Sequence, residues 1–321
     1  MNTLSKDSAT WREVDESSQD QRIDNYLQKI LKGVPKSHIY RILRSGEVRV
    51  NSRRVQASYR LQDGDKVRLP PIRTGVKPAR TGTGASVTRF SGAVLFEDED
   101  LLVVDKPSGV AVHGGSGISS GVIEQLRAAR PGLRFLELVH RLDRDTSGVL
   151  MLAKKRAALT GLHAQLRDGA VRKHYLVLVF GEWKDAKRNV KVALHKYVSS
   201  SGERRVVVDE EGQQAHTVFR LIRNFPGYSL LDAELKTGRT HQIRVHLAHI
   251  GYPIAGDDKY GDFDANQRLA KLGLKRMFLH AASLEFSHPR GAQTVRIEAP
   301  LAPELERFLQ SSRVVAGAKD A

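Results

Sequence analysis

Apolar positions near the start of the chain follow a helical period and then a strand period. Two short helices are predicted from apolar residues three or four apart, at Ile23, Tyr26, Leu27 and Ile30 and then at Ile39, Ile42 and Leu43. Ser37 is the expected N-cap of the second helix, and Gly46 is its expected end. The stretches EVRVNSRRV, with an Asn-Ser turn, and YRLQDGDKVRLP, with an Asp-Gly turn, predict strands. These elements make a small α+β module.

From residue 91 onward, short strand-like runs outnumber helical patterns. The predicted strands include AVLFE, LLVVDK, GVLMLAK, HYLVLVFG, HTVFRLI and YSLLDAELKTG, and the predicted helices are GVIEQLRAARPG, AALTGLHAQLRDG and THQIRVHLAHIG. Strands and helices do not alternate regularly, which favours an α+β fold with a mixed sheet over a doubly wound parallel one.

The pattern divides the chain into five segments. We expect a disordered tail at 1–17, the small module at 18–77, a linker rich in Gly and Thr at 78–90, a large domain at 91–311 and a second tail at 312–321. The N-terminus has no apolar stretch of a signal peptide, and no apolar run approaches the roughly 18 residues of a membrane span. A cytoplasmic protein is therefore expected.

Composition narrows the possible chemistry. The 321 residues include no cysteine, which excludes disulfides, thiolate zinc sites and thiolate nucleophiles. The formal net charge is +16, and residues 29–80 hold 14 Lys or Arg against three acids. So uneven a charge predicts a polyanionic partner. Nucleic acid is favoured over an anionic membrane because no basic amphipathic helix with an aromatic face is present.

The small module resembles the S4 RNA-binding domain. The segments QRIDNYLQK, SHIYRILRSGEVRVNSRRV and LQDGDKVRL carry this resemblance. It implies that the helices and the GEVRVN turn face structured RNA. The alternative is a generic basic domain, against which the charge count argues. The residues expected to contact phosphates are Lys36, Arg41, Arg44, Arg49, Arg53 and Arg54.

The stretch VHRLDRDTSGVLMLAKK, residues 139–155, places two arginines and two aspartates in a tight turn before an apolar strand. Asp145 precedes Thr-Ser-Gly, so it can accept hydrogen bonds from backbone amides of its own turn. Asp143 has no such local partner and needs a distant one to stay ionised beside the core. Arg244 is the candidate, on a helix expected to be capped by Thr240 and ended by Gly251.

The large domain resembles the RluA family of pseudouridine synthases. VDKPSGVAVHGG, VHRLDRDTSGVLMLAKK, VRKHYLVLVFG and LKTGRTHQIRVHLAHIGYPIAGDDKYG carry the resemblance, in the family's order, and it extends over residues 91–310. It implies a mainly antiparallel sheet with flanking helices and site-specific isomerisation of uridine to pseudouridine in large-subunit (23S) ribosomal RNA. It implies no cofactor and no membrane partner, and a monomer is expected.

The resemblance also implies roles for individual residues. Asp143 matches the catalytic aspartate, Tyr175 the active-site tyrosine packed against the base, and Arg244 the basic residue paired with the carboxylate. Arg141 matches the arginine that replaces the flipped uridine, with a phosphate contact as the alternative. His140 is included among the expected RNA contacts, and the loop GDDKYG is expected to face the substrate.

Several chemical alternatives remain open at this stage. Asp143 can add to C1′, take the C2′ proton to give a glycal, or add to C6 of the base. Tyr175 can instead be an ordinary buried strand residue. A metal site at His241, His246 and His249 is not expected, because cysteines and a clear acidic set are missing.

Two other classes of protein compete with the isomerase. A non-catalytic RNA-binding assembly factor would have no use for an acidic group in a basic cleft. A methyltransferase would need a glycine-rich methyl-donor loop, and methylation at base C5 generally needs a cysteine nucleophile. The first is not evident in the sequence and the second is absent.

Overall fold

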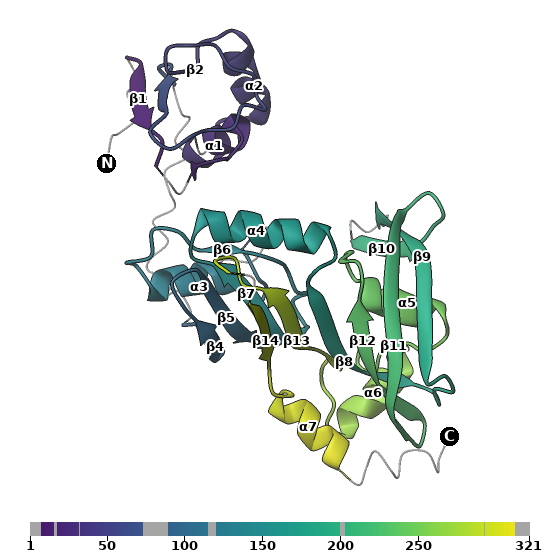
Figure 1. The fold of residues 1–321 in the computed structure, drawn as a ribbon. Coiled ribbons are helices and arrows are strands. Elements are labelled where there is room, and N and C mark those ends of the chain that lie inside the picture. The colour runs from purple at the N-terminus through teal and green to yellow at the C-terminus, as the bar shows by residue number, and fades with distance from the viewer. Residues whose placement is uncertain are drawn as a thin grey trace. The chain divides into compact units, whose positions relative to one another are not determined.

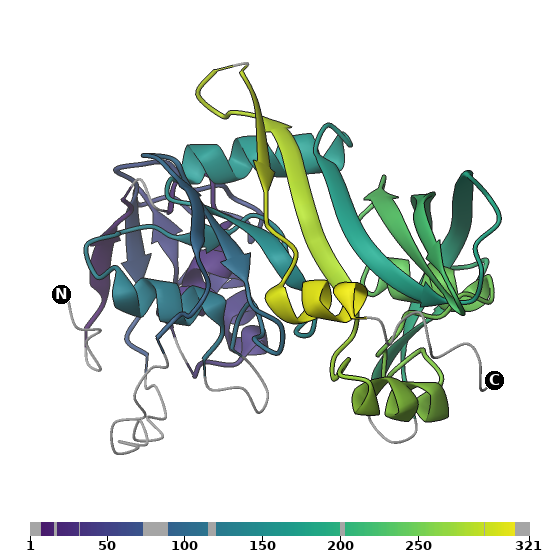
Figure 2. The same cartoon turned by 90° about the horizontal axis from the view of Figure 1, so that it is seen from below.

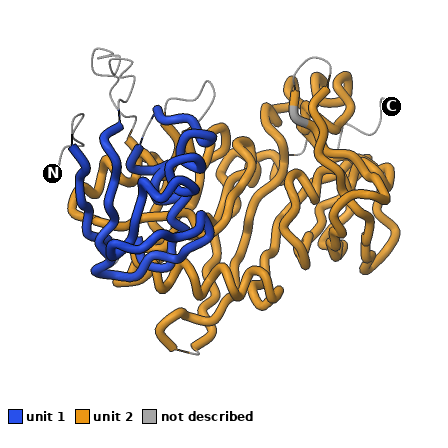
Figure 3. The backbone as a smooth tube through the Cα atoms, turned by 90° about the horizontal axis from the view of Figure 1, so that it is seen from above, with its two compact units in different colours: residues 1–86 blue, residues 87–321 orange. Residues whose placement is uncertain are grey.

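The computed structural model describes residues 8–15, 18–31, 33–72, 89–114, 120–199, 203–291 and 293–311. The chain divides into two compact units, residues 1–86 and 87–321 (Figure 3). Most of the expected linker 78–90, and the expected C-terminal tail 312–321, lie outside the described residues. No helix in the described part of the chain is both long and apolar enough to span a bilayer.

The N-terminal unit is a small α+β module with two helices beside a three-stranded sheet. Its elements are β1 (Thr10–Glu13), α1 (Ile23–Ile30), α2 (Lys36–Arg44), β2 (Arg49–Val50) and β3 (Lys66–Leu69), and the strand order is β1-β3-β2 (Figure 1). The apolar positions that predicted the helices form its core, with Ile23, Leu27, Ile39 and Ile42 fully buried. The predicted Asn-Ser turn is confirmed, because Asn51 and Ser52 have φ of 49° and 66°.

Two local expectations in this unit are wrong. Residues 10–13 were assigned to a disordered tail, but they form β1, which pairs antiparallel with β3. The pairing is made by backbone groups, which a pattern of side chains does not reveal. Ser37 does not cap α2. The helix begins one residue earlier, because the amides of His38 and Ile39 bond to the carbonyl of Pro35.

The larger unit contains one mixed sheet of eleven strands in the described residues. The strand order is β10-β9-β11-β12-β8-β13-β7-β5-β4, with β14 beside β13 and β6 beside β7. Among the described strands, only β13 and β7 pair in parallel. The predicted mixed, mainly antiparallel sheet is therefore confirmed. The strands are β4 (Val94–Glu97), β5 (Leu101–Lys106), β6 (Glu137–Leu138), β7 (Ser147–Ala153), β8 (Arg172–Phe180), β9 (Lys187–Val198), β10 (Arg204–Val208), β11 (Gln213–Phe225), β12 (Tyr228–Leu235), β13 (Leu279–Ser287) and β14 (Thr294–Glu298).

Helices cover both faces of this sheet. They are α3 (Val122–Ala129), α4 (Arg156–Arg167), α5 (Gln242–His249), α6 (Phe263–Lys271) and α7 (Pro303–Gln310). On β5, Leu102 and Val104 join one core with α3 and α5, whereas Leu101 and Val103 join another with α4. Strands buried on both faces read as continuous apolar runs, as LLVV does here. Figure 2 shows β8 and β13 running through the middle of the unit.

Gly148, in the second position of β7, lets β13 approach the start of that strand. Its φ is +105°, and a Cβ there would lie 2.2 Å from the carbonyl oxygen of Ala281. Glycine is therefore required both by the backbone conformation and by the close approach. The parallel pairing of β7 with β13 fixes the strand that directly follows the loop containing Asp143.

Candidate active site

A cleft of about 1130 Å³ opens beside the loop that joins β6 to β7. This loop forms one wall of the cleft. The first turn of α5 and the residues before it form a second wall, and β8 forms part of a third. Five of the residues singled out in the sequence line this cleft: His140, Arg141, Asp143, Tyr175 and Arg244. The fold thus brings together side chains from segments about a hundred residues apart.

Asp143 and Arg244 form an ion pair inside the cleft. Asp143 Oδ2 lies 3.2 Å from Arg244 Nη1. Arg244 is buried and is also held by Asp257, whose two oxygens accept hydrogen bonds of 2.7 Å from Nε and Nη2. This bidentate geometry fixes the plane of the guanidinium. The Nη1 group of Arg244 remains directed at Asp143. Arg244 is therefore the distant partner that the sequence predicted for Asp143.

Electrostatics keep the buried pair Arg244–Asp257 charged. Burial by itself would lower the pKa of Arg244, but the carboxylates of Asp257 and Asp143 outweigh it and raise the pKa above its ordinary value. Burial would raise the pKa of Asp257, but Arg244 holds it below the usual range. The opposite charges of the buried pair Arg244–Asp257 therefore neutralise each other. Asp143 lies beside it, partly exposed to the cleft.

Asp257 is a site residue that the sequence analysis did not identify. It lies in GDDKYG, which was expected to face the substrate. Its side chain is instead fully buried, and it also accepts hydrogen bonds from the amides of Lys259 and Tyr260. In the sequence, Asp257 follows a strand-like apolar run. A carboxylate in such a place needs a buried cationic partner, and this signal could have identified Asp257 as a site residue.

Lys106 and its neighbours hold the loop after Asp143. The fully buried Lys106 Nζ donates to the carbonyls of Pro107, Val110 and Arg144 at 2.8–2.9 Å. The amide of Gly109 donates to the same Arg144 carbonyl. Burial lowers the pKa of Lys106 to about 7. The segment VDKPSG, quoted in the sequence analysis only for its resemblance, is thus a support for the loop that carries Asp143.

Asp145 has a structural role, although not through the expected bonds. Its carboxylate pairs with the neighbouring Arg144 at 3.1 Å near the surface. Its main-chain carbonyl accepts hydrogen bonds from Ser108 Oγ and from Arg276 Nη2. No hydrogen bond from a backbone amide of its own turn to its carboxylate is found among the described residues. Of the two aspartates, Asp143 alone faces the cleft.

Tyr175 lies on β8, at the base of the cleft. Its ring is buried in the main core, where its strand neighbours are Ala233 on β12 and Ala281 on β13. Burial raises the pKa of its hydroxyl, and the charge of Asp143 adds to this. The hydroxyl therefore stays protonated at neutral pH. It makes no hydrogen bond with the described residues, so it remains available at the cleft.

Arg141 and His140 differ in their surroundings. Arg141 is exposed at the mouth of the cleft, and no ion pair or hydrogen bond of its side chain is found within the described chain. His140 accepts a 3.1 Å hydrogen bond at Nε2 from the amide of Met151 on β7. Burial lowers the pKa of His140 to about 4. His140 is thus a neutral support of the loop, and only Arg141 is free to contact RNA.

Lysine and arginine side chains outnumber acidic ones along the cleft. Lys173 and Arg167 have no side-chain partner in the part of the chain that the structure describes, and burial lowers the pKa of Lys173. Arg127 and Lys236 also line the cleft, paired with Glu137 and Glu234. A cleft of this charge suits a phosphate backbone.

The N-terminus of α5 differs from the sequence expectation. Thr240 is not the N-cap. The helix begins after His241, which has φ +52° and makes no capping hydrogen bond with its side chain. The Gln242 side chain instead accepts from the Arg239 amide and from Thr237 Oγ1. His241 Nε2 lies 3.9 Å from Asp143 Oδ1. The predicted end of the helix, Gly251, has φ +83° and is confirmed.

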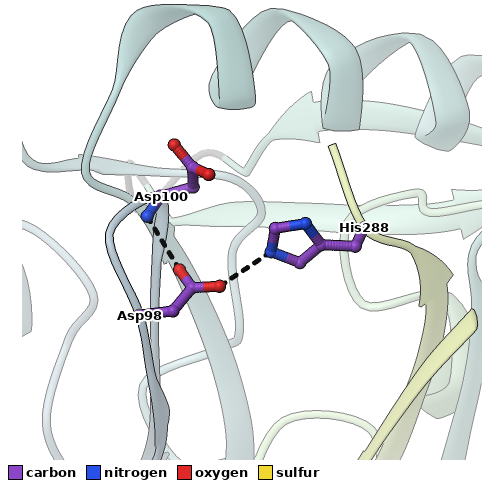
Figure 4. A group of neighbouring side chains, drawn as sticks. All are labelled: Asp98, Asp100 and His288. Atoms are coloured by element: carbon purple, nitrogen blue, oxygen red, sulfur yellow. Dashed lines mark hydrogen bonds and ion pairs between the residues drawn. The ribbon is translucent and has the colours of Figure 1, made fainter. Parts of the chain in front are cut away.

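The described residues include one group with the spacing of a metal site, Asp98, Asp100 and His288 (Figure 4). Asp98 accepts from the amides of Asp100 and Leu101 and from His288 Nε2. Asp100 pairs with Lys155 and Arg290. These cations neutralise the carboxylates, and the group therefore fits a structural tie between the β4–β5 turn and the segment after β13 better than a metal site.

The six basic residues expected to contact RNA in the N-terminal unit are all exposed. Arg41 pairs with Glu47 at 3.3 Å, and Arg49 Nε donates to the Gly46 carbonyl. Arg53 and Arg54 line a separate hollow of about 730 Å³ beside the β2 turn. Side-chain partners for four of them are not found among the described residues: Lys36, Arg44, Arg53 and Arg54.

Comparison with known proteins identifies the class. Residues 100–249 match the RNA pseudouridylate synthase family, and residues 21–67 match the S4 domain. The chain belongs to the RNA pseudouridylate synthase family and is an RNA pseudouridine synthase with an N-terminal S4 domain. Both resemblances seen in the sequence are thereby confirmed.

Its relatives cover almost the whole chain. Ribosomal large subunit pseudouridine synthase C of Pasteurella multocida is 54% identical, over 94% of this chain and 93% of the relative. The protein of the same name from Escherichia coli is 52% identical, over 91% and 93%. The solved structure of human RNA pseudouridylate synthase domain containing 1 shares the fold, with a TM-score of 0.57 and 24% identity over 72% of this chain and 96% of that one.

Proposed function

We propose that this protein isomerises uridine to pseudouridine at defined sites in large-subunit (23S) ribosomal RNA, with Asp143 as the reacting carboxylate. The observation that carries the proposal is the 3.2 Å pairing of Asp143 with Arg244 inside a basic cleft. The substrate is inferred from the name of relatives at 51–54% identity, ribosomal large subunit pseudouridine synthase C.

The reaction suits these side chains. The C1′–N1 bond breaks, the uracil turns, and a C1′–C5 bond forms, while C5 loses a proton and N1 gains one. No net oxidation and no group donor are involved, so no cofactor is proposed. An ionised Asp143 can add to C1′, remove the C2′ proton, or add to C6. In each case Arg244, 3.2 Å away, balances the negative charge of the carboxylate.

Two further residues act on the base and its surroundings. Tyr175, buried below the cleft with a free hydroxyl, is proposed to pack against the flipped uracil. Arg141, exposed and unpaired within the described residues, is proposed to fill the space that the uridine leaves in the RNA. Extruding the base is necessary because C1′ and C5 are not accessible within a stacked helix.

The S4 domain is proposed to bind structured RNA beside the target, through Lys36, Arg41, Arg44, Arg49, Arg53 and Arg54. Exposure of all six supports this. His140 is not retained as an RNA contact, because the Met151 amide occupies its Nε2. The proposed form is a monomer, and a ribosomal RNA substrate implies that it acts in the cytoplasm.

The test is tritium release from large-subunit ribosomal RNA labelled at uridine C5. Release together with an unchanged RNA mass supports isomerisation, because methylation would add about 14 Da to the product. If the protein binds the RNA tightly but releases no tritium, the proposal fails and a role as an RNA-binding assembly factor replaces it.

A further inference from the structure

His241 has an unusual backbone conformation at the wall of the cleft. Its φ of +52° is in the left-handed region, which costs a non-glycine residue on the order of 1 kcal/mol. The other described non-glycine residues with positive φ are Asp20, Asn51 and Ser52. Asp and Asn tolerate this region because their short side chains bond locally. The imidazole of His241 lies beside Asp143, with Nε2 3.9 Å from Oδ1.

Tyr260 contacts one ring nitrogen of His241. Tyr260 Oη accepts a 3.0 Å hydrogen bond from the Val206 amide and lies 2.8 Å from His241 Nδ1. When the phenol proton is directed at Nδ1, that nitrogen is the acceptor. In a neutral imidazole the proton is then on Nε2. Nε2 is the nitrogen that faces Asp143 Oδ1, at 3.9 Å.

The charges around His241 favour this neutral form. Burial lowers the pKa of His241, and Arg244 and Lys259 lower it further, against the opposing effects of Asp143 and Asp257. Burial raises the pKa of Tyr260. Near neutral pH, the imidazole is therefore uncharged and the phenol keeps its proton. Arg244 also lies over the Tyr260 ring, 5.1 Å from its centre, which holds the ring in place.

We propose that His241 is a positioning residue for the reaction, whose Nε2–H donates a hydrogen bond to Asp143 Oδ1 when RNA closes the cleft. Arg244 then binds Oδ2 and His241 binds Oδ1, so that two donors fix the plane of the carboxylate. His241 Nε2 and Asp143 Oδ1 are 3.9 Å apart in the free protein. Hydrogen bonds in active sites are often long in the free enzyme and shorten when substrate binds. The inference rests on the proposed role of Asp143.

The experiment compares His241→Leu, His241→Gln and Tyr260→Phe with the wild-type protein. Single-turnover tritium release from 5-labelled ribosomal RNA is measured at saturating enzyme between pH 5 and 8.5. Dissociation constants for the RNA and melting temperatures are measured in parallel. His249→Leu is the matched control, because His249 is on the same helix but is exposed and does not line the cleft.

Loss of the donor is expected to lower the rate of His241→Leu by about tenfold or more at pH 7.5, with RNA affinity within about twofold. The acid limb of its pH profile is expected to move to higher pH, because Asp143 loses a donor that stabilises its charged form. A glutamine amide can reach the position of Nε2, so His241→Gln is expected to recover most of the rate. Tyr260→Phe is expected to give an intermediate rate, because the imidazole can then adopt the wrong tautomer.

Two results would overturn the inference. One is a rate and an acid limb for His241→Leu that match those of His249→Leu. The other is an equal loss for Leu and Gln with an unmoved acid limb, which would indicate a structural role only. Both require a wild-type protein that releases tritium. A wild type that releases none would instead refute the proposed function itself.

Discussion

The carboxylate of Asp143 lies 3.2 Å from the guanidinium of Arg244, a residue 101 positions further along the chain. Arg244 is itself held by two 2.7 Å hydrogen bonds to the buried Asp257. Asp257 therefore fixes Arg244, and Arg244 in turn fixes Asp143. This order of dependence leads to different expectations for the three residues and for the loop around them.

The two aspartates of the HRLDRD turn are expected to respond differently to loss of charge. Asp143→Asn is expected to reduce single-turnover tritium release by about three orders of magnitude or more, because the reacting carboxylate is gone. Asp145→Asn, whose carboxylate pairs with Arg144 near the surface, is expected to stay within about threefold of the wild-type rate. Equal losses in the two variants would contradict the assignment of Asp143.

Asp257→Asn is expected to destabilise the protein by about 3–5 kcal/mol, because it leaves the buried cation Arg244 without its principal partner. Denaturant unfolding of the whole chain measures this. Glu99→Gln is the control, since Glu99 pairs with Arg290 at 2.6 Å on the surface and its loss is expected to leave stability nearly unchanged. A small loss for Asp257→Asn would mean that Asp143 alone compensates Arg244.

Gly148→Ala is expected to be among the most destabilising single-methyl additions in the chain. The new Cβ would meet the Ala281 carbonyl at 2.2 Å, so β7 and β13 would have to separate. Gly227→Ala is the matched control: its φ is also positive, at +77°, but its Cβ meets nothing within 4 Å. Backbone strain alone predicts a loss of about 1–2 kcal/mol for the control. Similar unfolding free energies for both variants would contradict the close approach.

Lys106→Met tests the buried amine. Burial lowers the pKa of Lys106 to about 7, below its ordinary value of 10.5 in an unfolded chain. The unfolded state then binds more protons between pH 7 and 10.5, so this lysine makes stability rise with pH across that window. The free-energy difference between wild type and Lys106→Met is expected to grow by up to about 1.4 kcal/mol per pH unit. A flat difference would indicate that the ammonium stays charged on its three carbonyls.

The S4 domain is expected to contribute affinity but not chemistry. Arg53→Gln with Arg54→Gln is expected to weaken RNA binding and to lower the slope of log K against log salt by about 1–2, because two phosphate contacts are lost. The rate on a short saturating RNA is expected to be unchanged. Arg296→Gln, on the exposed strand β14, is the control for lost surface charge. An equal fall in the saturated rate would assign Arg53 and Arg54 a role in the reaction.

Much of the fold follows from local patterns in the sequence. The buried run LLVV predicted β5, and the spacing of Ile243 and Leu247 predicted α5, because each segment faces a core with its own period. In the larger unit, the strands that were not predicted are β6, β9, β10, β13 and β14. Strand β9, for example, is largely exposed and mixes charged with apolar residues, so its alternation is weak.

The site was predicted in part, for a comparable reason. Asp143 and Arg244 could be paired from the sequence because one lacked a local partner and the other lay beside an apolar helix stripe. Lys106 acts through main-chain carbonyls, which no spacing of residues reveals. The error at Thr240 arose because the left-handed backbone of His241, rather than a side-chain cap, begins α5.

The parallel pairing between β7 and β13, the only one among the described strands, has a consequence for the synthesis of the protein. His280 pairs with Ser147, and Arg276 reaches back to the carbonyl of Asp145. Arg244 and Asp257 precede β13 in the chain and therefore leave the ribosome before it. A nascent chain thus lacks the strand that fixes the start of β7, directly after the Asp143 loop, until β13 has left the exit tunnel.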